Sequence, residues 1–317
     1  MNARNTRARR ALETGVGVFA SRRAPRLPDR AHPVAWFGRA ASALEGRSWR
    51  DDKASGVRHA VLGSGLGWIA GKVVPTVAAT ATTVAGQQLR DVAVEIADLL
   101  DAGELHAARE LLPSLVGRDP AALDEAGIAA AVIESVAENT VDAVVAPALW
   151  GSLLGGAGAG AYRAINTLDA MVGHRSTRYL NFGWASARLD DVANWVPARL
   201  TGALFAALGD ESAVAVARVI RADAPAHPSP NAGVAEAAMA AALGVQLGGT
   251  LSYAGRVEQR PTLGDGPRPS STDIHRAVAL AQRAETVLAG SMIVISVVQL
   301  ARGGWAARAV TLVRARR

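Results

Sequence analysis

The chain contains no cysteine, few aromatic residues and no acidic residue after Glu285. The absence of cysteine excludes disulfide scaffolds, thiolate zinc sites, cysteine nucleophiles and iron–sulfur clusters. An aromatic content of 4% argues against a β-sandwich, because such folds are rich in aromatic and β-branched residues. Half of the 317 residues are hydrophobic and 32 are glycine. This composition excludes a disordered chain and leaves two or three ordinary domains or one membrane-embedded bundle.

Basic residues gather at both ends of the chain, and the formal net charge is +6. Residues 1–50 contain eleven Arg and three acidic residues, and five Arg follow Glu285. Such ends are typical either of an Arg-rich arm that binds nucleic acid or of the cytoplasmic Lys/Arg excess that orients membrane proteins. We favour the second interpretation, because a nucleic-acid module does not need the long uncharged runs inside the chain. We therefore expect membrane lipid as a partner, no nucleic acid, and both termini in the cytoplasm.

Several apolar runs approach the length of about 20 residues that a helix needs to cross a bilayer. Because Ala and Gly contribute little transfer energy, a soluble Ala-rich bundle is the alternative. Two cytoplasmic ends require an even number of crossings, and the run 192–209 contains Pro197 and Arg199. We therefore expect four crossings in a multi-pass cell-membrane protein, with that run re-entrant or interfacial. The five runs are 60–86, 143–162, 192–209, 237–255 and 286–301.

The segment between the first two runs is amphipathic. Apolar residues recur at helical spacing over 89–100, and a second helix is expected over 105–116 after Gly103. No β-branched alternation bounded by turns is evident, so we predict an all-α fold: a polytopic membrane helix bundle with an amphipathic helical hairpin between the first two spans. The expected domains are an Arg-rich N-terminal tail (1–31), a single membrane-embedded helical domain (32–303) and a basic C-terminal tail (304–317).

Three carboxylates precede the second run at a spacing of four residues. Glu134, Glu138 and Asp142 fall on one stripe of a helix with no Lys or Arg interleaved. A charge costs roughly 2.5–3.5 kcal/mol at the centre of a bilayer, so the stripe implies a cation, a polar cavity or raised pKa values. Mg²⁺ is the natural partner, because it prefers oxygen ligands and commonly bridges carboxylates to phosphates. The alternative is a solvated surface stripe.

Two further polar clusters lie beside apolar runs. One contains Asn166 and Asp169, and the other contains Asp190, Asp191 and Asn194, which share a helix face and suit a metal or phosphate site. The alternative for each acid alone is a helix cap, and for each Arg an ordinary salt bridge. The accompanying arginines, which suit bidentate recognition of carboxylate or phosphate, are Arg163, Arg188 and Arg199.

The order of these blocks resembles the CobD/CbiB family of cobalamin-biosynthesis membrane enzymes, the adenosylcobinamide-phosphate synthases. The resemblance covers roughly residues 29–300. It is carried by 133–142, 162–173, 187–199 and the segment His227-Pro-Ser-Pro-Asn231-Ala-Gly233, with support from 32–38, 117–119, 247–255 and 260–264.

The resemblance implies a membrane ligase that attaches an aminopropanol phosphate, or a related amino-alcohol phosphate, to a propionate carboxyl of (adenosyl)cobyric acid with ATP and Mg. Its implied partners are the corrinoid, the amino-alcohol phosphate and other enzymes of the pathway. We assign acid–base catalysis to Glu134, Glu138, Asp142 and Asp169, and metal binding to Glu138, Asp142, Asp190 and Asp191. Substrate binding is assigned to Asn139, Arg163, Asn166, Arg188, Asn194, Arg199, His227 and Asn231.

The segment that comes nearest to a phosphate-binding loop does not support ATP binding. Gly67 to Lys72 has its glycines one position too close, and Val73 stands where Ser or Thr should bind Mg²⁺. ATP use therefore rests on the resemblance. Two other functions stay open: a membrane protein that binds or transports corrinoids, and a Mg-dependent membrane transferase acting on a diphosphate substrate.

Overall fold

A computed structural model of the protein describes residues 3–23, 30, 32–117, 120–121, 123–253 and 256–314. Its contacts divide the chain into two compact units, each built from separate segments. Parts of the predicted tails and of two family blocks lie outside the described residues, among them Arg118, Asp119, Ala254 and Gly255. The first unit comprises Met1–Val84, Pro147–Asp190 and Thr286–Arg317, and the second comprises Ala85–Ala146 and Asp191–Glu285.

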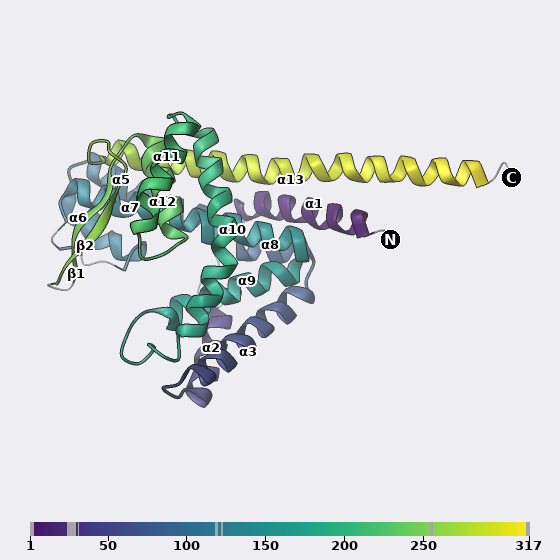
Figure 1. Ribbon diagram of the computed structural model, residues 1–317, viewed down its shortest axis with the longest axis horizontal. Coiled ribbons are helices and arrows are strands. Elements are labelled where there is room, and N and C mark those ends of the chain that lie inside the picture. The colour runs from purple at the N-terminus through teal and green to yellow at the C-terminus, as the bar shows by residue number, and fades with distance from the viewer. Residues whose placement is uncertain are drawn as a thin grey trace. The chain divides into compact units, whose positions relative to one another are not determined.

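Helices are the only regular secondary structure among the described residues of the first unit (Figure 1). It also contains most of α8 (Ala146–Leu154), the start of α10 (Trp184–Leu208) and the later part of α13 (Ser271–Arg314). Its other elements are α1 (Ala3–Ser21), α2 (Pro33–Ser48), α3 (Lys53–Lys72), α4 (Thr76–Thr83), α9 (Gly156–Leu168) and a π-helical turn (Asp169–Gly173).

The second unit combines helices with a small antiparallel hairpin. It also holds the parts of α10 and α13 that the first unit lacks. Its elements are α5 (Gly86–Asp101), α6 (Leu105–Leu111), α7 (Glu125–Thr140), a π-helical turn (Val141–Val145), α11 (Ala213–Asp223), α12 (Ala232–Leu243), β1 (Leu247–Tyr253) and β2 (Arg256–Leu263), with 3₁₀ turns at Leu112–Ser114 and Ala224–Ala226.

Helices α3 and α9 approach each other closely because glycines face one another across the contact. A Cβ added to Gly67 would lie 2.5 Å from the carbonyl oxygen of Gly160, and a Cβ on Gly71 would collide with the carbonyl of Gly156. These glycines are spaced by four residues in both helices, a pattern that allows close packing in lipid. Small residues therefore form the centre of the first unit.

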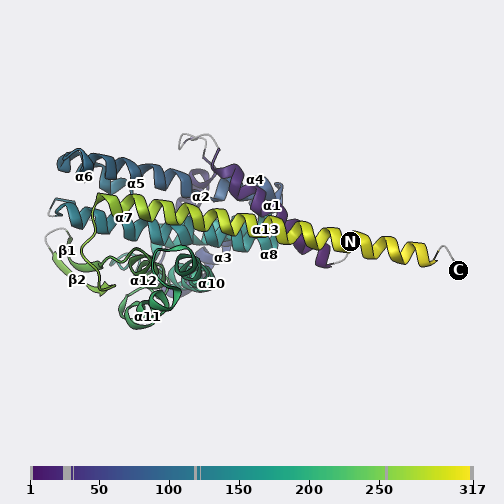
Figure 2. The same cartoon turned by 90° about the horizontal axis from the view of Figure 1, so that it is seen from above.

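Helix α1 occupies much of the predicted N-terminal tail and packs within the first unit. The guanidinium of Arg22 donates a 2.7 Å hydrogen bond to the hydroxyl of Thr286, and Gly15 contacts Ala289 so closely that it has no room for a Cβ. Figures 1 and 2 both show α1 lying along α13. The Arg-rich segment is thus a packed helix over residues 3–21, and α13 likewise continues through the predicted C-terminal tail to Arg314.

The core of the second unit is built from small aliphatic residues around a few large ones. Ile128, Ile133, Phe205 and Met239 are completely buried, and most of the remaining core positions are Ala or Val. The amphipathic periodicity over 89–100 is confirmed as α5, whose buried face joins this core. The second predicted helix of the hairpin also forms, but α6 ends at Leu111 and a 3₁₀ turn follows.

The hairpin of β1 and β2 departs from the prediction that nothing in the chain forms strands. The run 237–255 was expected to be one helical span, but α12 ends at Leu243 and Gly244 adopts a left-handed conformation. A bulge between Leu247 and Gly249 then begins the strand pairing. Two successive glycines with positive φ, Gly248 and Gly249, disfavour continued helix, so the apolar run of 237–255 is not one helix.

The other predicted spans differ in how continuous they are. Residues 60–86 are divided between α3, α4 and the first residue of α5, and the run 143–162 is broken at Gly155, whose φ of +74° ends α8. The run 286–301 lies within α13, and the run 192–209 lies almost entirely within α10. Among the described residues, one helix, Ser271–Arg302, is long and apolar enough to cross a membrane.

Candidate functional site

The first predicted carboxylate, Glu134, anchors the strand hairpin of the second unit. Its side chain is buried, and Oε1 accepts a 2.8 Å hydrogen bond from the backbone N–H of Gly248. A Cβ on Gly248 would collide with the carbonyl of Pro261, so the bulge itself requires glycine at this position. Glu134 therefore ties α7 to the bulge of β1, a structural task that the spacing of the acids did not predict.

The three carboxylates of the predicted stripe lie in three different environments. Glu134 is buried, Glu138 is exposed, and Asp142 is half-buried in the π-helical turn Val141–Val145. A π turn has more residues per turn than an α-helix, so the residues that follow it are rotated relative to a regular helix. Glu138 and Asp142 are accessible, whereas Glu134 is held by backbone. The adjacent Asn139 donates to the carbonyl and hydroxyl oxygens of Ser135.

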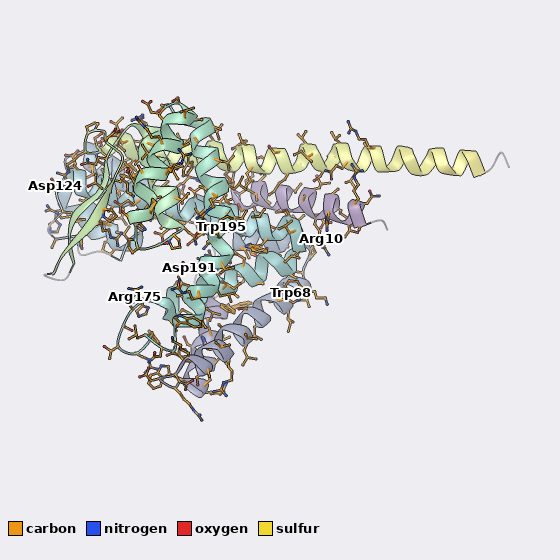
Figure 3. The ribbon with its side chains drawn as sticks, viewed as in Figure 1. Arg10, Trp68, Asp124, Arg175, Asp191 and Trp195 are labelled. Carbon is orange, nitrogen blue, oxygen red and sulfur yellow. The ribbon has the colours of Figure 1, made fainter. Side chains whose placement is uncertain are left out.

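Asn231 joins two predicted residues of α10. Its Nδ2 donates a 2.8 Å hydrogen bond to the backbone carbonyl of Asp191, and its Oδ1 accepts a 3.2 Å bond from Nη1 of Arg199. The guanidinium of Arg199 also lies 4.2 Å from the ring centroid of Trp195, which follows Asp191 by one turn of the same helix (Figure 3). The amide of Asn231 thus links the backbone at Asp191 to the guanidinium of Arg199, about two turns further along α10. A guanidinium held in this way is suited to bind an anionic group. Asn194, on the same stretch of helix, is buried.

A buried His227–Glu236 pair supports the segment that carries Asn231. Nδ1 of His227 lies 3.1 Å from both the backbone nitrogen and the carbonyl oxygen of Ser229. Nε2 of His227 lies 3.5 Å from Oε2 of Glu236, and both side chains are almost inaccessible to solvent. His227 is thus a structural residue of the turn as well as a predicted substrate ligand.

Glu236 was missed by the sequence analysis. The signal was present, because Glu236 is the one ionisable residue of α12, where every residue from Ala232 to Leu243 is buried. A carboxylate in such a helix is expensive unless it is paired.

In the first unit, α9 and α10 bring a second set of predicted residues together. Nη1 of Arg163 lies 3.5 Å from Oδ1 of Asn166, whose Nδ2 lies 3.5 Å from Oδ1 of Asp190. Asp169 begins the other π-helical turn, and its carboxylate covers Gly173, where a Cβ would collide with it. Arg188, one of the predicted phosphate ligands, is exposed on α10.

The predicted site residues therefore form two groups, one in each unit. Both groups offer carboxylate and amide oxygens, the ligands that Mg²⁺ prefers. In the second unit Glu138 is exposed, and Asp142 and Asp191 are half-buried, so their carboxylates are accessible to an ion. Their carboxylate oxygens are the ligand type that Mg²⁺ prefers, but in the described residues the three do not form a cluster like that of Asp98, Asp101 and His275. The π-helical turns at Asp142 and Asp169, which no sequence pattern predicted, mark one acid in each group.

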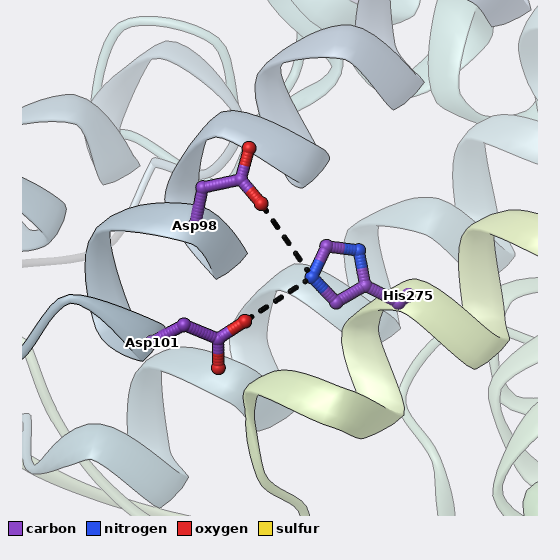
Figure 4. A group of neighbouring side chains, drawn as sticks. All are labelled: Asp98, Asp101 and His275. Carbon is purple, nitrogen blue, oxygen red and sulfur yellow. Dashed lines mark ion pairs between the residues drawn. The ribbon is translucent and has the colours of Figure 1, made fainter.

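One acidic cluster lies outside the predicted residues. Nε2 of His275 lies 3.6 Å from a carboxylate oxygen of Asp98 and 3.5 Å from one of Asp101 (Figure 4). The three ligand atoms lie within 4.8 Å of one another, close enough to hold a metal ion. Both aspartates are exposed, so the cluster joins α5 to α13 at the surface of the second unit as ordinary ion pairs do.

Comparison with known proteins identifies relatives over most of the chain. A family sequence model described as "CobD/Cbib protein" matches residues 15–281. A protein of Mycobacterium tuberculosis named cobalamin biosynthesis protein CobD is 49% identical over 270 residues, covering 80% of this chain and 86% of the relative. Proteins with the same name are 43% identical over 286 residues in Rhodobacter capsulatus, covering 84% of this chain and 89% of that one, and 41% identical over 279 residues in Geobacter metallireducens, covering 81% and 87%. No solved structure matches the chain.

Proposed function

The chain belongs to the CobD/CbiB family and acts in cobalamin biosynthesis, and from this premise we propose that it forms the amide bond between a corrinoid carboxyl and an amino-alcohol phosphate. The substrates would be (adenosyl)cobyric acid and aminopropanol phosphate or a close relative. ATP would supply the free energy. Family membership carries this proposal, and the contacts of Asn231 with Asp191 and Arg199 support it.

The reaction needs activation, because a carboxylate and an ammonium ion do not condense by themselves. In the proposed sequence the propionate carboxylate attacks the γ-phosphorus of ATP. An acyl phosphate forms and ADP leaves. The amine then attacks the acyl carbon, the amide C–N bond forms and inorganic phosphate leaves. The proton released from the ammonium passes to a carboxylate, for which the exposed Glu138 and the half-buried Asp142 and Asp169 are our candidates.

The arginines and amides of the two groups would bind the substrates. Arg199 is held by Asn231 and Arg163 lies beside Asn166, and an arginine fixed in this way can form bidentate hydrogen bonds to phosphate. Mg²⁺, when bound, would neutralise phosphate charge during transfer. The candidate ligands are Glu138, Asp142 and Asp191 in the second unit and Asp190 in the first.

We further propose that the protein is membrane-associated through α13 and crosses the bilayer more than once. The helix Ser271–Arg302 is long enough to span it, and only 28% of its most apolar window is buried within the protein. Large apolar residues exposed on α3, such as Val61 and Ile69, support a second lipid-facing segment. The even number of crossings and the cytoplasmic termini are part of the same proposal, which rests on the basic ends of the chain.

Amide formation by the purified full chain tests the proposal. The protein in detergent is incubated with cobyric acid, aminopropanol phosphate and Mg-ATP, and the product is identified by mass spectrometry. We expect one amide and one ADP per turnover, and a change of amine donor to threonine phosphate shows which amine is preferred. Arg199→Lys should lower kcat/KM about tenfold or more, because it removes the planar guanidinium that can form two parallel hydrogen bonds to phosphate.

Arg221, exposed on α11, provides the matched control for this experiment. Arg221→Lys should leave turnover unchanged. If the wild-type chain binds the corrinoid but forms no amide with either amine, the ligase proposal is wrong and a binding or transport function takes its place.

A further inference from the structure

The first unit contains a cavity whose lining includes one predicted site residue, Arg163. Its volume is about 400 Å³, it opens to the surface, and α2, α3, α4 and α9 line it. An engineered apolar cavity of roughly 150 Å³ already binds benzene, and small-molecule sites begin at about 300 Å³. The cavity is therefore large enough for a ligand considerably bigger than one ring.

The walls of this cavity offer almost no hydrogen bonds. Its three threonines donate their hydroxyls to carbonyls of their own helices: Thr82 to Ala78 at 3.0 Å, Thr83 to Ala79 at 2.9 Å and Thr167 to Arg163 at 2.7 Å. Their methyl groups and the neighbouring Val, Ala, Gly and Phe side chains leave an apolar lining. A corrinoid rich in amides, or a nucleotide, would lose hydrogen bonds to water here without replacement. A hydrocarbon would lose none.

The cavity is continuous with exposed apolar surface. Val73 and Val74 line it and are 77% and 42% exposed, and Ile69, one turn earlier on α3, is 61% exposed. An apolar wall that continues onto apolar surface is unfavourable in water and favourable against lipid chains. Entry from the bilayer would therefore require no desolvation of polar groups.

Two basic residues lie in or next to the lining of the cavity. Arg163 is the one charged residue among its described lining residues, and Lys72, between the lining residues Gly71 and Val73, is exposed. We propose that the cavity binds an acyl chain of an anionic phospholipid, with the phosphate beside Lys72. The proposal rests on the membrane association argued above and not on amide formation.

Native mass spectrometry of the full chain tests this proposal. Delipidated protein in detergent is mixed with phosphatidylglycerol or phosphatidylcholine of the same acyl chains. We expect one phosphatidylglycerol per chain and weaker retention of phosphatidylcholine. Ala70→Trp, which places a large side chain in the cavity, should reduce retention about tenfold, an effect of roughly 1.4 kcal/mol. Lys72→Gln should abolish the preference for phosphatidylglycerol.

Val61→Trp is the matched control, because Val61 is exposed on the same helix and does not line the cavity. It should retain phosphatidylglycerol as the wild type does. Ala78→Leu fills the cavity from α4 and gives an independent result if Ala70→Trp does not fold. Full retention in every folded cavity-filling variant, no retention by the wild type, or equal retention of both lipids would overturn the proposal. Amide formation is measured separately, so loss of lipid with unchanged turnover distinguishes this proposal from the ligase.

Discussion

The two units place their charged and apolar side chains in opposite ways. Most of the large apolar side chains that are exposed belong to the first unit. Of the four buried carboxylates among the described residues, Glu134, Glu236 and Glu285 belong to the second unit and Glu45 belongs to the first. The first unit is centred on a close glycine contact, whereas the second has a continuous aliphatic core. This difference supports the proposed lipid contact of the first unit, while buried polar contacts join the elements of the second. The exposed large apolar side chains of the second unit are Val192, Trp195, Val196 and Val214.

The largest effect is expected at the buried ion pair of the second unit. Nη1 of Arg90 lies 2.7 Å from Oε2 of Glu285, and both side chains are at most 5% exposed. Glu285→Ala leaves the arginine charge buried, so we expect the free energy of unfolding to fall by about 3–5 kcal/mol. Thermal unfolding in detergent measures this. The double variant Arg90→Met/Glu285→Leu should recover most of the loss, and no recovery would show that the second unit does not depend on this pair as argued.

Breaking the buried His227–Glu236 pair should have the next largest effect. It should lower both the stability of the protein and its affinity for substrate. Glu236→Ala removes the buried polar partner of Nε2 of His227, which costs about 1–3 kcal/mol. Because the turn presents Asn231 to Arg199, the KM for the amino-alcohol phosphate should rise more than kcat falls. Glu236→Gln retains an acceptor and should restore most of the affinity. Equal values of kcat and KM for the Ala and Gln variants would show that this pair does not position the site residues.

The glycine contact of the first unit gives a comparable test for that region. Gly67→Val should destabilise the protein by about 1–3 kcal/mol, because the side chain overpacks the contact of α3 with α9. Gly65, two residues earlier on α3, has no neighbouring atom within 4 Å of an added Cβ. Gly65→Ala should therefore stabilise the helix slightly, by at most about 1 kcal/mol. Equal thermal midpoints for the two variants would contradict a close-packed centre.

The smallest effect is expected at an exposed pair of the second unit. Two 2.7 Å hydrogen bonds from Arg268 lower the pKa of Asp124, which also caps α7 through the N–H of Gly127. A lowered pKa contributes stability that is complete above the unfolded value of 3.8 and is lost as the pH falls through the folded value. Asp124→Asn keeps the cap and should cost at most about 1 kcal/mol at neutral pH. The difference from wild type should vanish at about pH 2–3, as chemical unfolding at several pH values would show.

A helix could be predicted where apolar residues recurred at helical spacing. Site residues could be predicted where polar side chains lay beside apolar runs. The amphipathic run 89–100 formed α5, and Asp191, Arg199 and Asn231 came together within the second unit. Both signals are local, since they depend on residues three or four apart. The resemblance added the block at 227–233, which no periodicity identifies.

Other features could not be predicted because they depend on contacts distant in sequence or on backbone register. The bulge at Gly248 is held by Glu134, more than a hundred residues earlier. Runs of Ala and Gly have similar preferences for a buried helix, a membrane span or a close glycine contact, so the run 143–162 gave no sign of its break at Gly155. The π-helical turns at Asp142 and Asp169 change the register by less than any sequence periodicity resolves.

The π-helical turn Val141–Val145 has a genetic consequence. Such a turn accommodates one residue more than a regular helix of the same length, so loss of a single codon there would leave the helix unbroken. The side chains beyond the deletion would keep their positions, whereas those inside the turn would rotate by up to about 100°, the rotation contributed by one residue. A three-nucleotide deletion would thus redirect the carboxylate of Asp142 while the flanking helices stay in place.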